Sequence, residues 1–173
     1  MEYRNLGKWG VKLSKVGLGS YLTIGMHVSD DLAAECVALA FDSGINWFDT
    51  ANAYNRGQAE VALGKILRDY PRESYVLATK VWAPMGDGPN DQGLSRGHII
   101  NAVEASLRRL QTDYIDLYQT HAPDQETPLD ETLRAMDDLV RSGKVRYVGC
   151  SNYPAWLLAK ALWVSDVQKL VRY

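Results

Sequence analysis

The sequence repeats one pattern five times: an apolar run of strand length, then an amphipathic segment of helix length. The apolar runs are nearly continuous, which is typical of strands that are covered on both faces in a parallel sheet. We expect strands at 16–22, 45–51, 75–82, 114–122 and 145–152, and helices at 30–44, 57–70, 94–111, 128–143 and 154–166. Short connections and uniform composition predict one α/β domain over residues 1–173. A short hairpin around Gly7 to Gly10 precedes the first unit.

The charge, the hydropathy and the cysteine content of the chain argue against several classes of protein. The net charge is −2 and 46% of the residues are hydrophobic, so the chain lacks the basic surface that nucleic acid or an anionic membrane requires. No apolar stretch approaches the roughly 20 residues that span a bilayer, and the start MEYRNLGKWG does not resemble a signal peptide. Cys36 and Cys150 are too few for a disulfide framework and lack metal-ligand spacing. We expect a cytoplasmic protein without a metal site, membrane insertion or a nucleic-acid partner.

Two architectures are compatible with such units: a doubly wound open sheet and a (β/α)8 TIM barrel. An open sheet that binds a dinucleotide carries G-x-G-x-x-G after its first strand, but here Gly17 and Gly19 are followed by Leu22 at the third position. In a barrel, the carboxyl ends of all strands converge on one face, where the active site lies. Polar residues occupy those ends in four of the units, namely Asp49, Lys80, His121 and Ser151–Asn152. The pattern favours the barrel, of which the chain supplies about the first five βα units.

Each of these polar residues also has an ordinary structural explanation. Asp49 could cap a turn, Tyr54 could be half-buried with its hydroxyl in water, and Lys80 could extend from its strand into solvent. His121 could be a hydrogen-bonded structural histidine, and Ser151–Asn152 could cap the helix that follows them. These alternatives stay open at the level of sequence.

Together, the same residues suggest acid–base chemistry. Lys80 follows the apolar run VLAT, so its stem is expected to be buried, and a buried ammonium is costly unless it is paired. Asp49, at the same level of the adjacent strand, is its natural partner. Lys80 beside Tyr54 would stabilise a phenolate, which suits the phenol to donate or accept a proton near neutrality. His121 would supply a donor that orients or polarises a carbonyl oxygen.

The order of these residues resembles the aldo-keto reductase family. The resemblance covers essentially the whole chain and rests on VGLGSYLTIG (16–25), GINWFDTANAYNRGQAEVALGKIL (44–67), VLATKVW (76–82), ASLRRLQTDYIDLYQTHAPD (105–124) and GKVRYVGCSN (143–152). The segments GLSRGHII (93–100) and GLGSYLTIG (17–25) look closest to the branch that contains the potassium-channel β subunits, here with the catalytic histidine retained.

The resemblance implies a barrel that binds NADPH without a Rossmann fold and reduces small-molecule aldehydes and ketones. It implies that Tyr54 is the general acid, that Lys80 and Asp49 tune it, and that His121 orients the substrate carbonyl. The cofactor-binding residues would be Ser20, Tyr21, Asp49, Ser151 and Asn152, the last two at the nicotinamide carboxamide. Trp82 would wall the substrate pocket, although packing inside the barrel explains it equally well.

The chain departs from the family in length. A complete barrel has eight strands in typically about 250 residues, whereas strands six to eight are not identifiable in these 173 residues. The tail VQKLVRY (167–173) could begin a sixth strand. We expect either a truncated chain, which we favour, or a homo-oligomer in which another copy completes the sheet. We expect a verified monomer of this length to bind NADPH poorly, and the preference for NADPH over NADH rests on the resemblance alone.

Three functions are therefore open. The first is an NADPH-dependent carbonyl reductase, the second a cofactor-sensing binding module like the channel β subunits, and the third an inactive half-barrel. The retained His121 favours the enzyme, because a scaffold has no need of that donor beside Tyr54.

Overall fold

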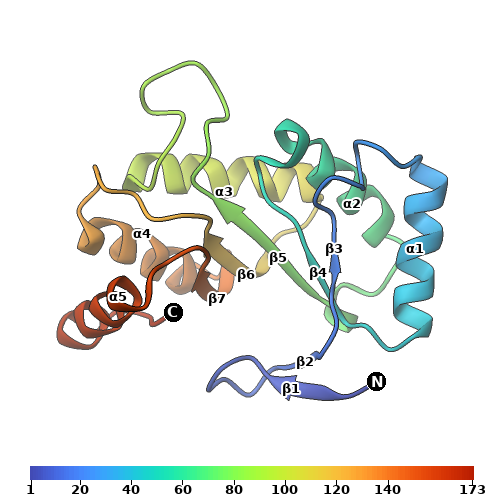
Figure 1. Cartoon of the computed structure of the whole chain (residues 1–173), viewed down its shortest axis with the longest axis horizontal. Helices are drawn as coiled ribbons and strands as arrows, with labels where there is room; N and C mark the ends of the chain where they lie inside the picture. The colour runs from blue at the N-terminus through green and yellow to red at the C-terminus, as the bar shows by residue number, and fades with distance from the viewer.

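The centre of the fold is a five-stranded parallel sheet, seen in a computed structural model that describes residues 1–173 (Figure 1). Its strands are β3 (Leu18–Gly19), β4 (Trp47–Asp49), β5 (Val76–Val81), β6 (Ile115–Thr120) and β7 (Val145–Cys150). They pair in chain order, each parallel to the next. A doubly wound sheet needs a point at which the strand order reverses, and this sheet has none. The order therefore contradicts the doubly wound alternative and agrees with consecutive strands of a barrel.

One helix follows each strand. The helices are α1 (Asp30–Asp42), α2 (Gln58–Leu67), α3 (Arg96–Leu110), α4 (Leu129–Arg141) and α5 (Ala155–Gln168). In Figure 1 they form an arc around the sheet, from α1 past α3 to α5. Ser29 and Ser95 cap α1 and α3 through hydrogen bonds from Leu32 and His98. No helix is both long enough and apolar enough to cross a lipid bilayer.

Three segments differ from the sequence prediction. The tail at 167–173 does not begin a sixth strand, because α5 continues to Gln168 and the remaining residues have no regular structure. The helix expected at 57–70 is preceded by a separate 3-10 turn, η1 (Tyr54–Gly57), and a second one, η2 (Arg72–Ser74), precedes β5. The strand expected at 16–22 is reduced to β3, since a turn follows in which the Thr23 N–H bonds the Ser20 carbonyl at 3.2 Å. Ser20 and Tyr21 therefore lie in a loop.

The predicted hairpin is present and lies at the amino ends of the strands. Its strands, β1 (Tyr3–Asn5) and β2 (Lys12–Ser14), are antiparallel. The indole N–H of Trp47 donates to the Ser14 carbonyl at 3.1 Å, and the Ser14 N–H donates to Asn46 Oδ1 at 2.8 Å. These bonds hold the hairpin against the start of β4, away from the strand ends that carry the candidate site (Figure 1).

The two faces of the sheet have different chemistry. Side chains alternate along a strand, and on β5 the Thr79 hydroxyl bonds Glu60 on α2, whereas Lys80 on the opposite face bonds Asp49 on β4. The helix-covered face carries the hydrophobic core, which includes Phe48, Leu77 and Tyr118. Polar side chains on the other face are thus supported by a buried apolar layer behind them.

Candidate active site

A strained turn holds Tyr54 just beyond β4. Two of its residues, Asn55 at φ 46° and Arg56 at φ 50°, are left-handed without being glycine, a conformation that costs roughly 1–2 kcal/mol per residue. The Asn55 amide donates to the Gly25 carbonyl and helps to fix the turn. Gly57 follows at φ 88°, and a Cβ there would lie 2.7 Å from Cδ of Arg109. Strain of this kind persists only where the surroundings over-determine it, as they do at functional sites.

Lys80 is the centre of the polar cluster. Its ammonium donates to Asp49 Oδ2 at 2.5 Å, to the Thr50 carbonyl at 2.8 Å and to the Tyr54 hydroxyl at 3.2 Å. An ammonium has three donors, so all of them are used. The residue is only 6% exposed, which contradicts the alternative that Lys80 extends into solvent, and the partnership of Asp49 with Lys80 replaces the turn-capping alternative.

A neutral side chain that the sequence reasoning missed completes the contacts of the carboxylate. Nε2 of Gln119 donates to Asp49 Oδ1 at 3.3 Å. Gln119 is paired in register with Lys80 on the neighbouring strand. The sequence signal that could have found it is the spacing: Gln119 stands two residues before His121, and side chains two apart in an extended segment point to the same side.

His121 lies beside Tyr54, and its surroundings lower its pKa. The two rings meet edge to face with centroids 5.6 Å apart. Burial lowers the pKa of the His121 imidazole, the nearby Lys80 ammonium lowers this pKa further, and the Asp49 carboxylate opposes both effects. Nδ1 is buried without a protein partner, so this nitrogen does not fit the alternative of a hydrogen-bonded structural histidine.

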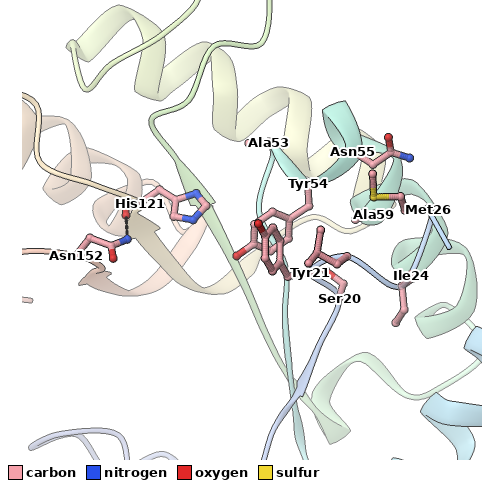
Figure 2. Close-up of a pocket in the computed structure, with 11 residues that line it drawn as sticks. Ser20, Tyr21, Ile24, Met26, Ala53, Tyr54, Asn55, Ala59, His121 and Asn152 are labelled. Carbon is pink, nitrogen blue, oxygen red and sulfur yellow. Dashed lines mark hydrogen bonds between the residues drawn. The ribbon is translucent and has the colours of Figure 1, made fainter. Parts of the chain in front are cut away.

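Tyr54 and His121 face a cavity of about 610 Å³ (Figure 2). Apolar side chains such as Ile24 and Met26 form part of its wall, and its polar lining comes from Ser20, Tyr21, Tyr54, Asn55, His121 and Asn152. The Tyr21 ring lies 4.9 Å from the Tyr54 ring, and Figure 2 shows the two rings side by side. The Ser20 hydroxyl is buried without a partner. A buried hydroxyl without a partner is costly, so the cavity is suited to a ligand that bonds it.

Ser151 and Asn152 do not cap a helix. The residue before α5 is Pro154, which makes no side-chain capping bond, so the capping alternative is wrong. Instead, the Asn152 amide donates to the His121 carbonyl at 2.8 Å (Figure 2). It also donates to the Ser151 hydroxyl at 3.1 Å. Asn152 has a φ of 60°, and its side chain lines the cavity beside His121.

Trp82 lies apart from this cavity. It borders a neighbouring groove of about 460 Å³ together with Gly93, Pro123 and Asp124. The side chain is 38% exposed in this chain. The structure therefore does not bring Trp82 together with Tyr54, and a contact with a substrate would require a ligand that extends from the cavity into the groove.

The arrangement can donate a proton to a bound oxygen. Tyr54 supplies the hydroxyl, Lys80 supplies a positive charge beside it, and Asp49 balances that charge. The His121 imidazole adjoins the same cavity. A planar ligand could stack on Tyr21 and bond Ser20 and the polar side chain of Asn152, which fits a ring with polar substituents.

Comparison with known proteins places this geometry in context. Residues 15–171 match the model of the Aldo/keto reductase family. A crystal structure of the thermostable aldo-keto reductase Tm1743, in complex with the inhibitor epalrestat, superposes with a TM-score of 0.84 and 37% sequence identity. The match covers 95% of this chain and 58% of that chain. This chain thus spans little more than half of the protein that it resembles.

Proposed function

Because the chain belongs to the aldo/keto reductase family, we propose that it reduces aldehydes and ketones to alcohols with NADPH, and that Tyr54 donates the proton. The observation that carries the proposal is the buried Lys80 ammonium between Asp49 and the Tyr54 hydroxyl. A cation beside a phenol stabilises the phenolate that remains after proton transfer. The oxidoreductase class is proposed from the family, because the chain covers 58% of the matched structure, and the cofactor and the roles of the residues are proposals as well.

The proposed reaction balances with one hydride and one proton. NADPH, when bound, supplies the hydride to the carbonyl carbon. The electrons of the C=O double bond then move to oxygen, which takes the proton from Tyr54 Oη. Lys80 stabilises the resulting phenolate, and solvent returns the proton to it. His121, whose pKa is lowered by burial and by the Lys80 ammonium, would orient the carbonyl oxygen as a hydrogen-bond donor.

Four side chains would hold the cofactor. The unpartnered Ser20 hydroxyl and the Tyr21 ring line one side of the cavity. Asn152 lines the other side, with Ser151 bonded to it, and these two would bind the nicotinamide carboxamide. Asp49 does not line the cavity, so its proposed contribution to cofactor binding would run through Lys80. Preference for NADPH over NADH rests on the family resemblance.

The environment and the substrate class are also proposals. The free cysteines Cys36 and Cys150 suit the reducing cytoplasm. Small-molecule carbonyl compounds would enter beside His121, and a larger substrate would reach Trp82 in the adjacent groove.

NADPH oxidation with a reactive aromatic aldehyde tests the proposal, with the alcohol product identified. Tyr54→Phe should lower turnover by about 100-fold or more, because general acid catalysis contributes roughly 10²–10⁴-fold. Tyr70→Phe is the matched control, since the Tyr70 ring stacks on Phe41 at 4.1 Å, away from the cavity. A folded wild-type protein without turnover would overturn the reductase proposal, and NADPH binding measured by calorimetry in that protein would instead support a cofactor-sensing module.

A further inference from the structure

We infer that Gln119 is a positioning residue of this site: its carboxamide fixes the Asp49 carboxylate so that Oδ2 faces Lys80. The inference rests on the proposed function, because it concerns how Asp49 and Lys80 support Tyr54. It assigns a role to a side chain that touches neither the phenol nor the cavity lining.

The two oxygens of Asp49 have different partners. Oδ2 accepts from the Lys80 ammonium at 2.5 Å, and Oδ1 accepts from Nε2 of Gln119 at 3.3 Å. A carboxylate held at both oxygens cannot turn about its Cβ–Cγ bond without losing one of these bonds. The Asp49 side chain is 25% exposed, so without Gln119 water would reach Oδ1 and leave the carboxylate free to rotate.

The sheet register brings the three side chains together. Gln119 on β6 pairs with Lys80 on β5 and with Gly149 on β7. All of them stand on the face that carries Asp49, and Gln119 reaches across β5 to β4. A Cβ added at Gly149 would lie 3.4 Å from Cγ of Gln119, so β7 packs closely behind the glutamine and the carboxamide extends toward Asp49.

The chemistry of an amide suits this position. A neutral donor holds Oδ1 without competing for the negative charge that Asp49 shares with Lys80. A cationic side chain would compete with Lys80 for that charge, and a carboxylate would repel Asp49. Glutamine is long enough to extend from β6 across β5 to Asp49, and its amide is a neutral donor.

Steady-state kinetics of Gln119→Met and Gln119→Glu test the inference. Gln119→Met keeps the approximate shape and removes the donor, and it should lower kcat about 10-fold with little change in KM, the effect of losing one hydrogen bond to a charged group. Gln119→Glu should lose more at neutral pH and recover as the pH falls, because a protonated carboxyl group restores a donor. If Gln119 only filled space, the kcat of Gln119→Glu would not recover as the pH falls. Gln58→Met, at an exposed position on α2, is the control and should match the wild type.

A second readout does not depend on turnover. The side-chain amide resonances of Gln119, identified by their loss in Gln119→Met, should shift in Asp49→Asn, while those of Gln58 stay in place. Unmoved Gln119 resonances, or a Gln119→Met variant with wild-type kcat, would overturn the inference. A protein without any turnover would refute the proposed function, and the resonances would still decide whether Gln119 holds Asp49.

Discussion

The Lys80 ammonium lies 2.5 Å from Oδ2 of Asp49, and this contact joins two neighbouring strands at their carboxyl ends. Lys80 is almost fully buried. A buried cation is tolerated when its charge is balanced and its donors are used, and both conditions are met here. The same ammonium bonds the Tyr54 hydroxyl. The ion pair with Asp49 therefore makes the burial of Lys80 tolerable and also keeps a positive charge beside the phenol.

The coupling between Asp49 and Lys80 can be measured through stability alone. We expect Asp49→Asn and Lys80→Met each to lower the free energy of unfolding by about 1–3 kcal/mol, the usual effect of leaving a buried polar partner unsatisfied. The double variant should lose less than the sum, because it leaves neither charge unpaired. Urea unfolding followed by circular dichroism gives all three values. Strict additivity would show that the two side chains do not interact.

Histidine NMR tests the electrostatics of the site. Burial, and then the Lys80 ammonium, lowers the pKa of His121, while Asp49 opposes the shift. The C2–H signal of His121, assigned with His121→Gln, should therefore titrate below the ordinary histidine value of about 6.5. Lys80→Met should raise this pKa, and Asp49→Asn should lower it further. A His121 pKa at or above the ordinary value would contradict the account.

The same shift has a consequence for stability. Between the folded-state pKa of His121 and about pH 6.5, the unfolded chain binds more protons at His121 than the folded chain does. The stability that His121 contributes is therefore present above that pH and is lost as the pH falls through the folded-state pKa. Burial also lowers the pKa of His98, so the contribution of His121 is the difference between the wild type and His121→Gln in urea unfolding across this range. A difference that does not vary with pH would contradict the prediction.

Arg109 should be worth far more to stability than an exposed arginine. It bonds the fully buried Glu60 at 2.6 Å, and Thr79 bonds the other carboxylate oxygen at 2.6 Å. Arg109→Met leaves the Glu60 charge unpaired, and breaking a buried pair in this way costs about 3–5 kcal/mol. Arg96→Met breaks an exposed pair with Asp138 and should cost about 0–1 kcal/mol. Equal losses in urea unfolding would contradict the buried arrangement.

Two glycines in helices should respond oppositely to alanine. A Cβ at Gly64 on α2 would lie 2.6 Å from the backbone of Leu110 on α3, whereas a Cβ at Gly97 would meet nothing within 4 Å. Gly64→Ala should cost about 1–3 kcal/mol through overpacking, and Gly97→Ala should gain about 0.5–1 kcal/mol from helix propensity. Thermal unfolding of both variants checks this pair. A stabilised Gly64→Ala variant would show that α2 and α3 do not pack this closely.

The sequence predicted the structure best where one physical rule allowed few arrangements of strands or side chains. Nearly continuous apolar runs predicted parallel strands, and the structure has five of them in chain order. A lysine inside an apolar strand needs a nearby carboxylate, and that requirement predicted the contact between Lys80 and Asp49. Both arguments depend on local pattern and on the convergence of parallel strand ends.

Other features depend on contacts that no local pattern encodes. The η1 turn uses two left-handed residues, Asn55 and Arg56, that carry no glycine signal. The contact of Gln119 with Asp49 crosses a whole strand, and the groove beside Trp82 is set by how two loops pack together. In each case the deciding partner is distant in sequence, so propensity and spacing do not reveal it.

The most direct test of the central claim, that Tyr54 and Lys80 act as one proton-donating unit, is a kinetic double-mutant cycle. Turnover of NADPH and aldehyde would be measured for Tyr54→Phe, Lys80→Met and the double variant. We expect each single variant to lose about 100-fold or more, and the double variant to be no slower than the worse single one, because residues that act as a unit are not additive. Losses that multiply in the double variant, or a Tyr54→Phe variant with the wild-type rate, would contradict the account.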